Sequence, residues 1–176
     1  MESTMSVVLD HAGPAELSLE ELYRTCARDV YAYVASLLRD RAASEDVTSQ
    51  AFERALARRR TFDAGRGTQR AWLFAIARNA ALDELRRRRR TVALVVEPAQ
   101  GAPVDGGDEE TAVRRATVRA ALAGLDARDR ELIALKFHAG LGTAEIAEVL
   151  GISPTNASTR VHRAVTRLRE ACHASA

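Results

Sequence analysis

The segment from residue 153 to residue 168 carries side chains suited to reading the edges of base pairs. Asn156, Arg160 and Arg163 follow one another at steps of four and three residues, the spacing of one face of an α-helix. An asparagine can pair with adenine through two hydrogen bonds, and an arginine can pair with guanine or bind a phosphate. The opposite face is apolar: Ala157, Val161, Ala164, Val165 and Leu168. The pattern predicts a helix with one face in a core and the other free to contact DNA.

The residues before this helix predict the turn that places it. Thr143 is expected to cap a helix over 143–150, and Gly151 to end that helix in the left-handed conformation. Ser153 and Pro154 suit the start of the next helix, so the pattern is typical of a helix-turn-helix. The alternative is an ordinary helical hairpin with a solvated outer face. The predicted reading face consists of Thr155, Asn156, Ser158, Thr159, Arg160, Arg163 and Arg167.

A second stripe follows one side of a helix predicted over about 70–90. Its members are Trp72, Asn79, Asp83, Arg86 and Arg90, and the last two belong to a run of five consecutive arginines. An aromatic ring, an amide and cations on one surface suit DNA whose bases are partly unstacked. The stripe alone is weak support, because a tryptophan equally suits a core and an arginine run equally suits a solvated helix end.

The remaining apolar periodicity predicts an all-α chain. Helices are expected from Leu19 to Leu37, where Ser18 and Glu21 form a capping box, and from Ser44 to about Arg60, with Ser44 as its cap. A loop over 61–69 precedes the arginine-rich helix, and further helices are expected over 111–123 and 126–139. Residues 91–96 are the nearest approach to a strand, and they are short and isolated.

A linker separates two predicted helical domains. Between residues 97 and 110 the chain holds two prolines, three glycines and five acidic residues, and it has no basic residue. The predicted division is a domain over 18–91, a flexible acidic linker over 92–110 and a second domain over 111–172. The linker is expected to be a solvated tether that could also shield the neighbouring arginines.

Bulk composition limits the classes of protein to which the chain can belong. The formal net charge is only +2, so DNA binding must be argued from where the charges lie. Cys26 and Cys172 are the only cysteines, which fits a reducing cytosol better than a disulfide-stapled secreted domain. No segment approaches about 20 consecutive apolar residues. A cytoplasmic protein that is neither exported nor a membrane protein is therefore expected.

Three motifs in order resemble the extracytoplasmic-function (ECF) sigma factors of bacterial RNA polymerase. They are the run SEDVTSQAFERAL over 44–56, the run RAWLFAIARNAALDEL over 70–85, and the block over 125–170. The resemblance covers nearly the whole chain from Leu19 to Glu170. It implies a sigma factor that binds core RNA polymerase and promoter DNA, and whose usual further partner is an anti-sigma factor. It implies no small-molecule substrate, cofactor or metal, and no enzymatic activity.

The resemblance also implies roles for individual residues. In the family, region two binds the polymerase and melts the minus-ten promoter element, and region four reads the minus-thirty-five element. The helix that binds the polymerase would carry Asp46, Ser49, Gln50 and Phe52, although Phe52 equally suits a core. The loop over 61–69 would capture a flipped base, for which unstacking must be offset by a fitted pocket. The residues implied at the minus-ten element are Phe62, Trp72, Asn79, Asp83, Arg86 and Arg87.

The chain departs from the family pattern at several of these positions. The polymerase-binding helix commonly has glutamine and then an acid where this chain has Ser49 and Gln50. The recognition helix commonly has a basic residue at position 158 and arginine at position 165, where this chain has Ser158 and Val165. Polymerase binding is expected to be retained, but the promoter sequence cannot be carried over from the family.

Two other classes of protein are alternatives to this expectation. A dimeric regulator would keep the helix-turn-helix but bind duplex DNA without the polymerase. A hydrolytic or metal-dependent enzyme would have to use the four histidines, His11, His138, His162 and His173. The spacing of these histidines matches no metal-ligand or nucleophile pattern, so the second alternative has little support.

Overall fold

The computed structural model describes residues 18–92 and 109–174, and within them every regular element is a helix. The N-terminal module contains α1 (Leu19–Leu38), α2 (Arg41–Arg58), the short 3₁₀ turn η1 (Arg59–Thr61) and α3 (Gln69–Val92). The C-terminal module contains α4 (Glu109–Gly124), α5 (Ala127–Ile133), the π-helical turn η2 (Ala134–His138), α6 (Thr143–Leu150) and α7 (Pro154–Ala174). The all-α prediction is confirmed. His11, most of the predicted linker and residues 93–96 of the strand candidate lie outside the described residues, whereas residues 91 and 92 form the helical end of α3.

Local capping explains most of the helix boundaries. Ser18 and Glu21 form the predicted reciprocal capping box at the start of α1. Asp126 caps α5 by accepting a hydrogen bond from the backbone N–H of Asp129 at 2.8 Å. Gly151 ends α6 with a φ of 64°, and Ser153 caps α7. The predicted turn of the helix-turn-helix is therefore present.

Two predicted caps are wrong. The second helix begins at Arg41, because Asp40 accepts a hydrogen bond from the N–H of Ala43 and so caps the helix four residues before the predicted cap, Ser44. Ser44 is instead buried inside α2 and donates its hydroxyl to the Asp40 carbonyl. At α6 the cap is Gly142, whose N–H donates to Glu145 at 2.9 Å, and Thr143 is the first helical residue. In both cases a neighbouring carboxylate satisfies the free amide.

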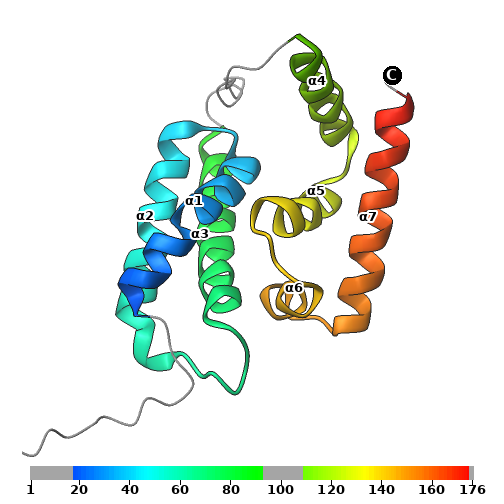
Figure 1. The fold of residues 1–176 in the computed structure, drawn as a ribbon. Helices are drawn as coiled ribbons and strands as arrows, with labels where there is room; N and C mark the ends of the chain where they lie inside the picture. The colour runs from blue at the N-terminus through cyan, green and yellow to red at the C-terminus, as the bar shows by residue number, and fades with distance from the viewer. Residues whose placement is uncertain (1–17, 93–108, 175–176) are drawn as a thin grey trace, which may run out of the picture.

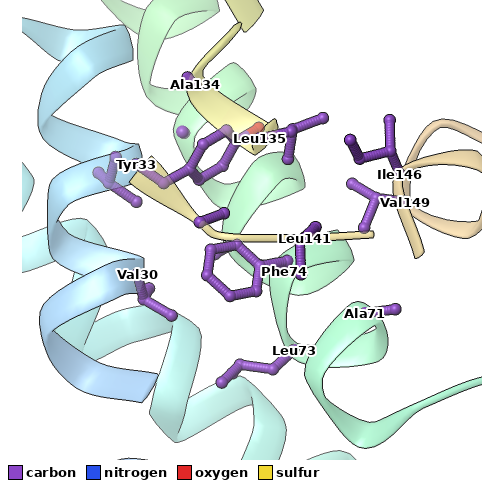
Figure 2. Packing of buried hydrophobic residues seen from close by; sticks show 14 of the residues in the cluster. Val30, Tyr33, Ala71, Leu73, Phe74, Ala134, Leu135, Leu141, Ile146 and Val149 are labelled. Atoms are coloured by element: carbon purple, nitrogen blue, oxygen red, sulfur yellow. The ribbon is translucent and has the colours of Figure 1, made fainter. Parts of the chain in front are cut away.

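The two modules lie side by side, with α5 and α6 between the N-terminal helices and α7 (Figure 1). Their contact is apolar and continuous with the interior of each module. Phe74 of α3 and Tyr33 of α1 lie beside Leu135 and Leu141, and Ile146 of α6 joins the same cluster (Figure 2). All five side chains are almost completely buried. The two modules therefore share one core. Their association does not depend on the predicted linker alone.

None of the helices within the described ranges is both long and apolar enough to cross a lipid bilayer.

Candidate nucleic-acid interface

The predicted reading face of α7 points away from the core. Asn156, Arg160 and Arg163 are exposed, while Ala157, Val161 and Ala164 on the opposite side are buried. Thr155 and Ser158 are also exposed, and the Thr159 hydroxyl donates to the Thr155 carbonyl at 3.0 Å. Among the described residues, neither Arg160 nor Arg163 forms an ion pair. The helix thus presents an amide and two uncommitted guanidinium groups to solvent.

Arg167 differs from the other arginines of this face. Its Nη1 donates to Oδ2 of Asp129 at 2.5 Å, and Asp129 lies almost buried on α5. The hydrogen bond to Asp129, together with its negative charge, raises the pKa of Arg167. Arg167 therefore joins α7 to α5, a contact between residues 38 positions apart that no local pattern could predict.

An aromatic pocket lies where the loop after η1 meets α3. The rings of Phe62 and Trp72 stand 5.6 Å apart at an angle of 59°, beside a cavity of about 210 Å³. Thr61, Arg66 and Thr68 also line the cavity. Phe62 and Trp72 are only partly buried, so the rings are not simply core residues. Two aromatic faces and a nearby guanidinium can stack a base and contact its phosphate.

The stripe along α3 is exposed at its polar positions. Asn79, Asp83 and Arg86 all face solvent. Oδ1 of Asp83 accepts a hydrogen bond from Arg86 at 2.9 Å, and its Oδ2 lies 3.7 Å from Arg54 of α2. Arg87 forms two hydrogen bonds with Glu84, at 2.8 and 2.9 Å. Several of the arginines on this side are thus held in place by carboxylates of the same helix.

The predicted polymerase-binding residues divide into two groups. Asp46, Ser49 and Gln50 are exposed on α2. Phe52 is only 7% exposed and meets Tyr23 edge to face, with ring centroids 4.8 Å apart. The ring of Phe52 thus belongs to the core, the second of the two interpretations that its sequence position allowed.

Sequence reasoning missed the apolar residues exposed around Phe52. Tyr23 of α1 is 57% exposed and Leu56 of α2 is 48% exposed, although the apolar periodicity of both helices predicts a buried face. Helical periodicity identifies a face but not how far the neighbouring helices cover it. Tyr23, which contacts the ring of Phe52, and Leu56 of α2 therefore both expose apolar surface.

Sequence reasoning also missed the polar contacts between the modules. The guanidinium of Arg78 on α3 donates to Glu131 on α5 at 2.7 and 3.3 Å. The Tyr33 hydroxyl lies 3.4 Å from the same carboxylate, and its burial, with the charge of Glu131, raises its pKa well above the ordinary value. Arg70 donates to the Ala139 carbonyl of the C-terminal module at 2.5 Å, and it also binds Asp29 of its own module at 2.6 Å. These partners are too distant in sequence for any motif to pair them.

No three histidine, cysteine or acidic side chains within 18–92 and 109–174 are grouped closely enough to hold a metal ion.

The fold and the exposed α7 define a two-module helical protein with a helix-turn-helix at its C-terminal end. The family model of sigma-70 region 2 matches residues 22–91, and the model of sigma-70 region 4 matches residues 115–168. The chain belongs to the ECF group of the sigma-70 family.

Individual relatives agree with this membership. The chain is 34% identical to the ECF RNA polymerase sigma factor SigL of Mycobacterium tuberculosis, an alignment that covers 90% of this chain and 91% of that protein. It is 29% identical to the ECF RNA polymerase sigma factor SigX of Bacillus subtilis, over 88% of this chain and 84% of the other.

Among solved structures, the sigma factor RpoE of Bartonella quintana in complex with the anti-sigma factor NepR matches with a TM-score of 0.69 and 26% identity. This match covers 86% of the chain and 94% of that one. CnrH, in complex with the cytosolic domain of CnrY, matches with a TM-score of 0.66 at 24% identity, covering 90% of this chain and 89% of that one. The second match supports the fold alone.

Proposed function

We propose that this protein binds core RNA polymerase and directs it to promoters, with its N-terminal module at the minus-ten element and its C-terminal module at the minus-thirty-five element. Promoter-specific initiation is the activity of the sigma-70 family to which the chain belongs. One observation supports the assignment of a promoter element to each module. The chain has both an exposed face of amide and guanidinium groups on α7 and an aromatic pocket beside α3.

The C-terminal module reads duplex DNA through α7. Asn156, Arg160 and Arg163 are the side chains whose chemistry discriminates between bases, because each can form two hydrogen bonds to a base edge in the major groove. Thr155, Ser158 and Thr159 contribute shorter polar contacts on the same face. Arg167 contributes little to base recognition, because its guanidinium group is already bound to Asp129.

The N-terminal module binds the melted strand. A base leaves the stack and enters the pocket lined by Phe62 and Trp72, where stacking on an aromatic ring offsets the loss of its neighbours. Asn79 and Asp83 face the strand next to the pocket, and Arg86 and Arg87 contribute positive charge near the phosphates. The chain supplies binding energy here and no reactive group, so the proposed role includes no chemistry of its own.

The polymerase contacts the exposed face of α2. Asp46, Ser49 and Gln50 provide a polar strip, and Tyr23 and Leu56 provide apolar area beside it. Interfaces commonly combine an apolar centre with a polar rim in this way. An anti-sigma factor is the expected second partner, by analogy with the solved sigma factor complex to which this chain is similar.

A gel-shift experiment separates this function from that of a conventional dimeric regulator. The purified protein is mixed with a duplex promoter fragment in the presence and in the absence of core polymerase. A sigma factor produces a specific shifted band only when core polymerase is present. A specific band formed by the protein alone, at a stoichiometry of two chains for each duplex, would favour the dimeric regulator.

A further inference from the structure

Arg167 continues the reading face of α7, but its guanidinium group is bound inside the C-terminal module. It lies four residues after Arg163, which places it one turn, or about 6 Å, further along the same side of the helix. Arg160, Arg163 and Arg167 line one surface hollow, and Asp129 forms part of its wall. The side chain of Arg167 therefore lies next to the two guanidinium groups that are proposed to contact DNA.

The carboxylate of Asp129 is an acceptor in a fixed position. Asp129 lies in the first turn of α5, where the helix dipole favours a negative charge. Its backbone N–H donates to the cap residue Asp126 at 2.8 Å, and only 9% of its side chain is exposed. Within the described residues, Arg167 is the only cation that pairs with this carboxylate. Asp129 thus depends on Arg167 to balance a charge that water barely reaches.

The two partners of this ion pair differ in exposure, and the difference decides where Arg167 stays. Arg167 keeps 55% of its side-chain exposure, so DNA can reach its guanidinium group. Its departure would leave the nearly buried carboxylate of Asp129 without a partner, which costs more than the loss of an exposed ion pair. A phosphate contact at the protein surface returns little free energy, because water and salt screen it. Arg167 is therefore expected to stay on Asp129 while α7 lies in the major groove.

We propose that Asp129 is a positioning residue that withholds Arg167 from promoter DNA and so limits the affinity of the C-terminal module for duplex DNA. This inference rests on the proposed function of α7. A released Arg167 would reach the DNA backbone beyond the base pairs that Arg163 contacts, because it lies one turn further from the start of the recognition helix.

The withheld contact would add affinity without adding recognition. Phosphate contacts carry no sequence information, so a released Arg167 would strengthen binding equally to promoter and to non-promoter duplexes. A genome offers a large excess of non-promoter sites. By keeping sequence-independent binding low, Asp129 leaves less of the protein bound away from promoters.

A purely structural role for the ion pair predicts the opposite change. If the pair only fixes α7 against α5, loss of Asp129 loosens the recognition helix and weakens DNA binding. If Asp129 withholds Arg167, loss of the carboxylate frees a cation and strengthens DNA binding. The salt dependence separates the two roles as well, since only a freed cation adds a phosphate contact.

The test uses holoenzyme assembled from core polymerase and the full-length protein. Its affinities for a promoter fragment and for a non-promoter duplex of equal length are measured by gel shift at about 50 and about 200 mM salt. Asp129→Asn removes the charge and keeps the shape, and Asp129→Ala removes the acceptor altogether. Both are made with and without Arg167→Gln. Glu170→Gln is the matched control, because the charge of Glu170 also acts on Arg167 but does not hold its guanidinium group. Urea denaturation checks that each variant is folded.

We expect Asp129→Asn and Asp129→Ala to bind both duplexes more tightly than the wild type. The gain should be about 3.5 times larger at the lower salt concentration, the change that one added phosphate contact produces. In the Arg167→Gln background, the same substitutions of Asp129 should give no gain. Glu170→Gln should keep the salt dependence of the wild type.

A gain that persists in the Arg167→Gln background, or an equal gain in Glu170→Gln, would overturn the withholding role. Weaker binding by the Asp129 variants would overturn it in favour of a structural role. Arg160→Gln and Arg163→Gln test the proposed function of α7 in the same assay. If these two weaken promoter binding and the Asp129 variants show no gain, only the withholding role fails. If neither changes promoter binding, the proposed function of α7 fails, and the inference fails with it.

Discussion

Arg167 is bound by Asp129, whereas Arg160 and Arg163 form no ion pair within the described residues. Substitution of Arg160 or Arg163 is therefore the better test of DNA recognition. Their guanidinium groups are exposed and opposite the buried face of α7, so truncation opens no cavity. Arg163→Ala should cost about 1 to 3 kcal/mol of discrimination and relax preference at one base pair of the upstream element. Transcription from a library of minus-thirty-five sequences measures this preference. A uniform loss on every sequence, with a flatter salt dependence, would instead mean that Arg163 only binds phosphate.

Substitution of Asp46 tests the proposed polymerase-binding surface of α2. Asp46→Arg reverses a charge on the exposed face of α2, where no core contact depends on it. We expect binding to core polymerase, measured by surface plasmon resonance, to be lost while the helical circular dichroism is unchanged. Glu170→Arg serves as the matched charge reversal and should bind normally. Normal core affinity of Asp46→Arg would remove Asp46 from the interface.

The residues that sequence predicted well are those whose partners are close in the chain. Ser18, Gly151 and Ser153 act on amides or turns within three or four residues of themselves. The contact of Arg167 with Asp129 and the exposure of Tyr23 were not predicted, because both depend on how other helices pack around these residues. A face assigned by periodicity is available for binding only where no such helix covers it.

At the scale of elements, the turn between α6 and α7 fixes the direction of the recognition helix. Gly151 has a φ of 64°, and a Cβ added there would meet no atom within 4 Å. The cost of Gly151→Ala is therefore backbone strain alone, about 1 to 2 kcal/mol. Urea denaturation should show this loss of stability. A change below roughly 0.3 kcal/mol would mean that the turn relaxes to another conformation without cost.

The ends of the elements were harder to predict than their existence. The start of α2 was misplaced because Ser44 and Asp40 are both good capping residues, and the structure uses the earlier one. The helix predicted over 126–139 is interrupted by the π-helical turn η2, where Leu135 and Ala139 become buried against the other module. Such a change of helical type follows from tertiary packing, which no local pattern records.

At the scale of the whole molecule, the division into domains remains a prediction. The shared core joins the modules, yet the acidic segment between them has the composition of a linker. Limited proteolysis should therefore cut first between Pro98 and Glu110 and leave two protected fragments. A first cut between Arg70 and Leu85, inside α3, would contradict the division.

The association of the modules could not have been read from the sequence. Its main contacts join Arg78 to Glu131 and Thr68 to Glu145, pairs separated by 53 and 77 residues. The apolar part uses Phe74, Leu141 and Ile146, which would equally suit the separate cores of two isolated domains. The existence of both modules was predictable from sequence, whereas their closed arrangement depends on complementarity between surfaces.

At the same scale, the protein as a whole directs core RNA polymerase to promoters. Run-off transcription with purified core polymerase and a pool of genomic promoter fragments tests it most directly, with and without the protein. We expect discrete transcripts that require the protein and whose start sites share spaced minus-ten and minus-thirty-five elements. The same transcripts from core polymerase alone, or no specific transcript when the protein is present, would contradict it.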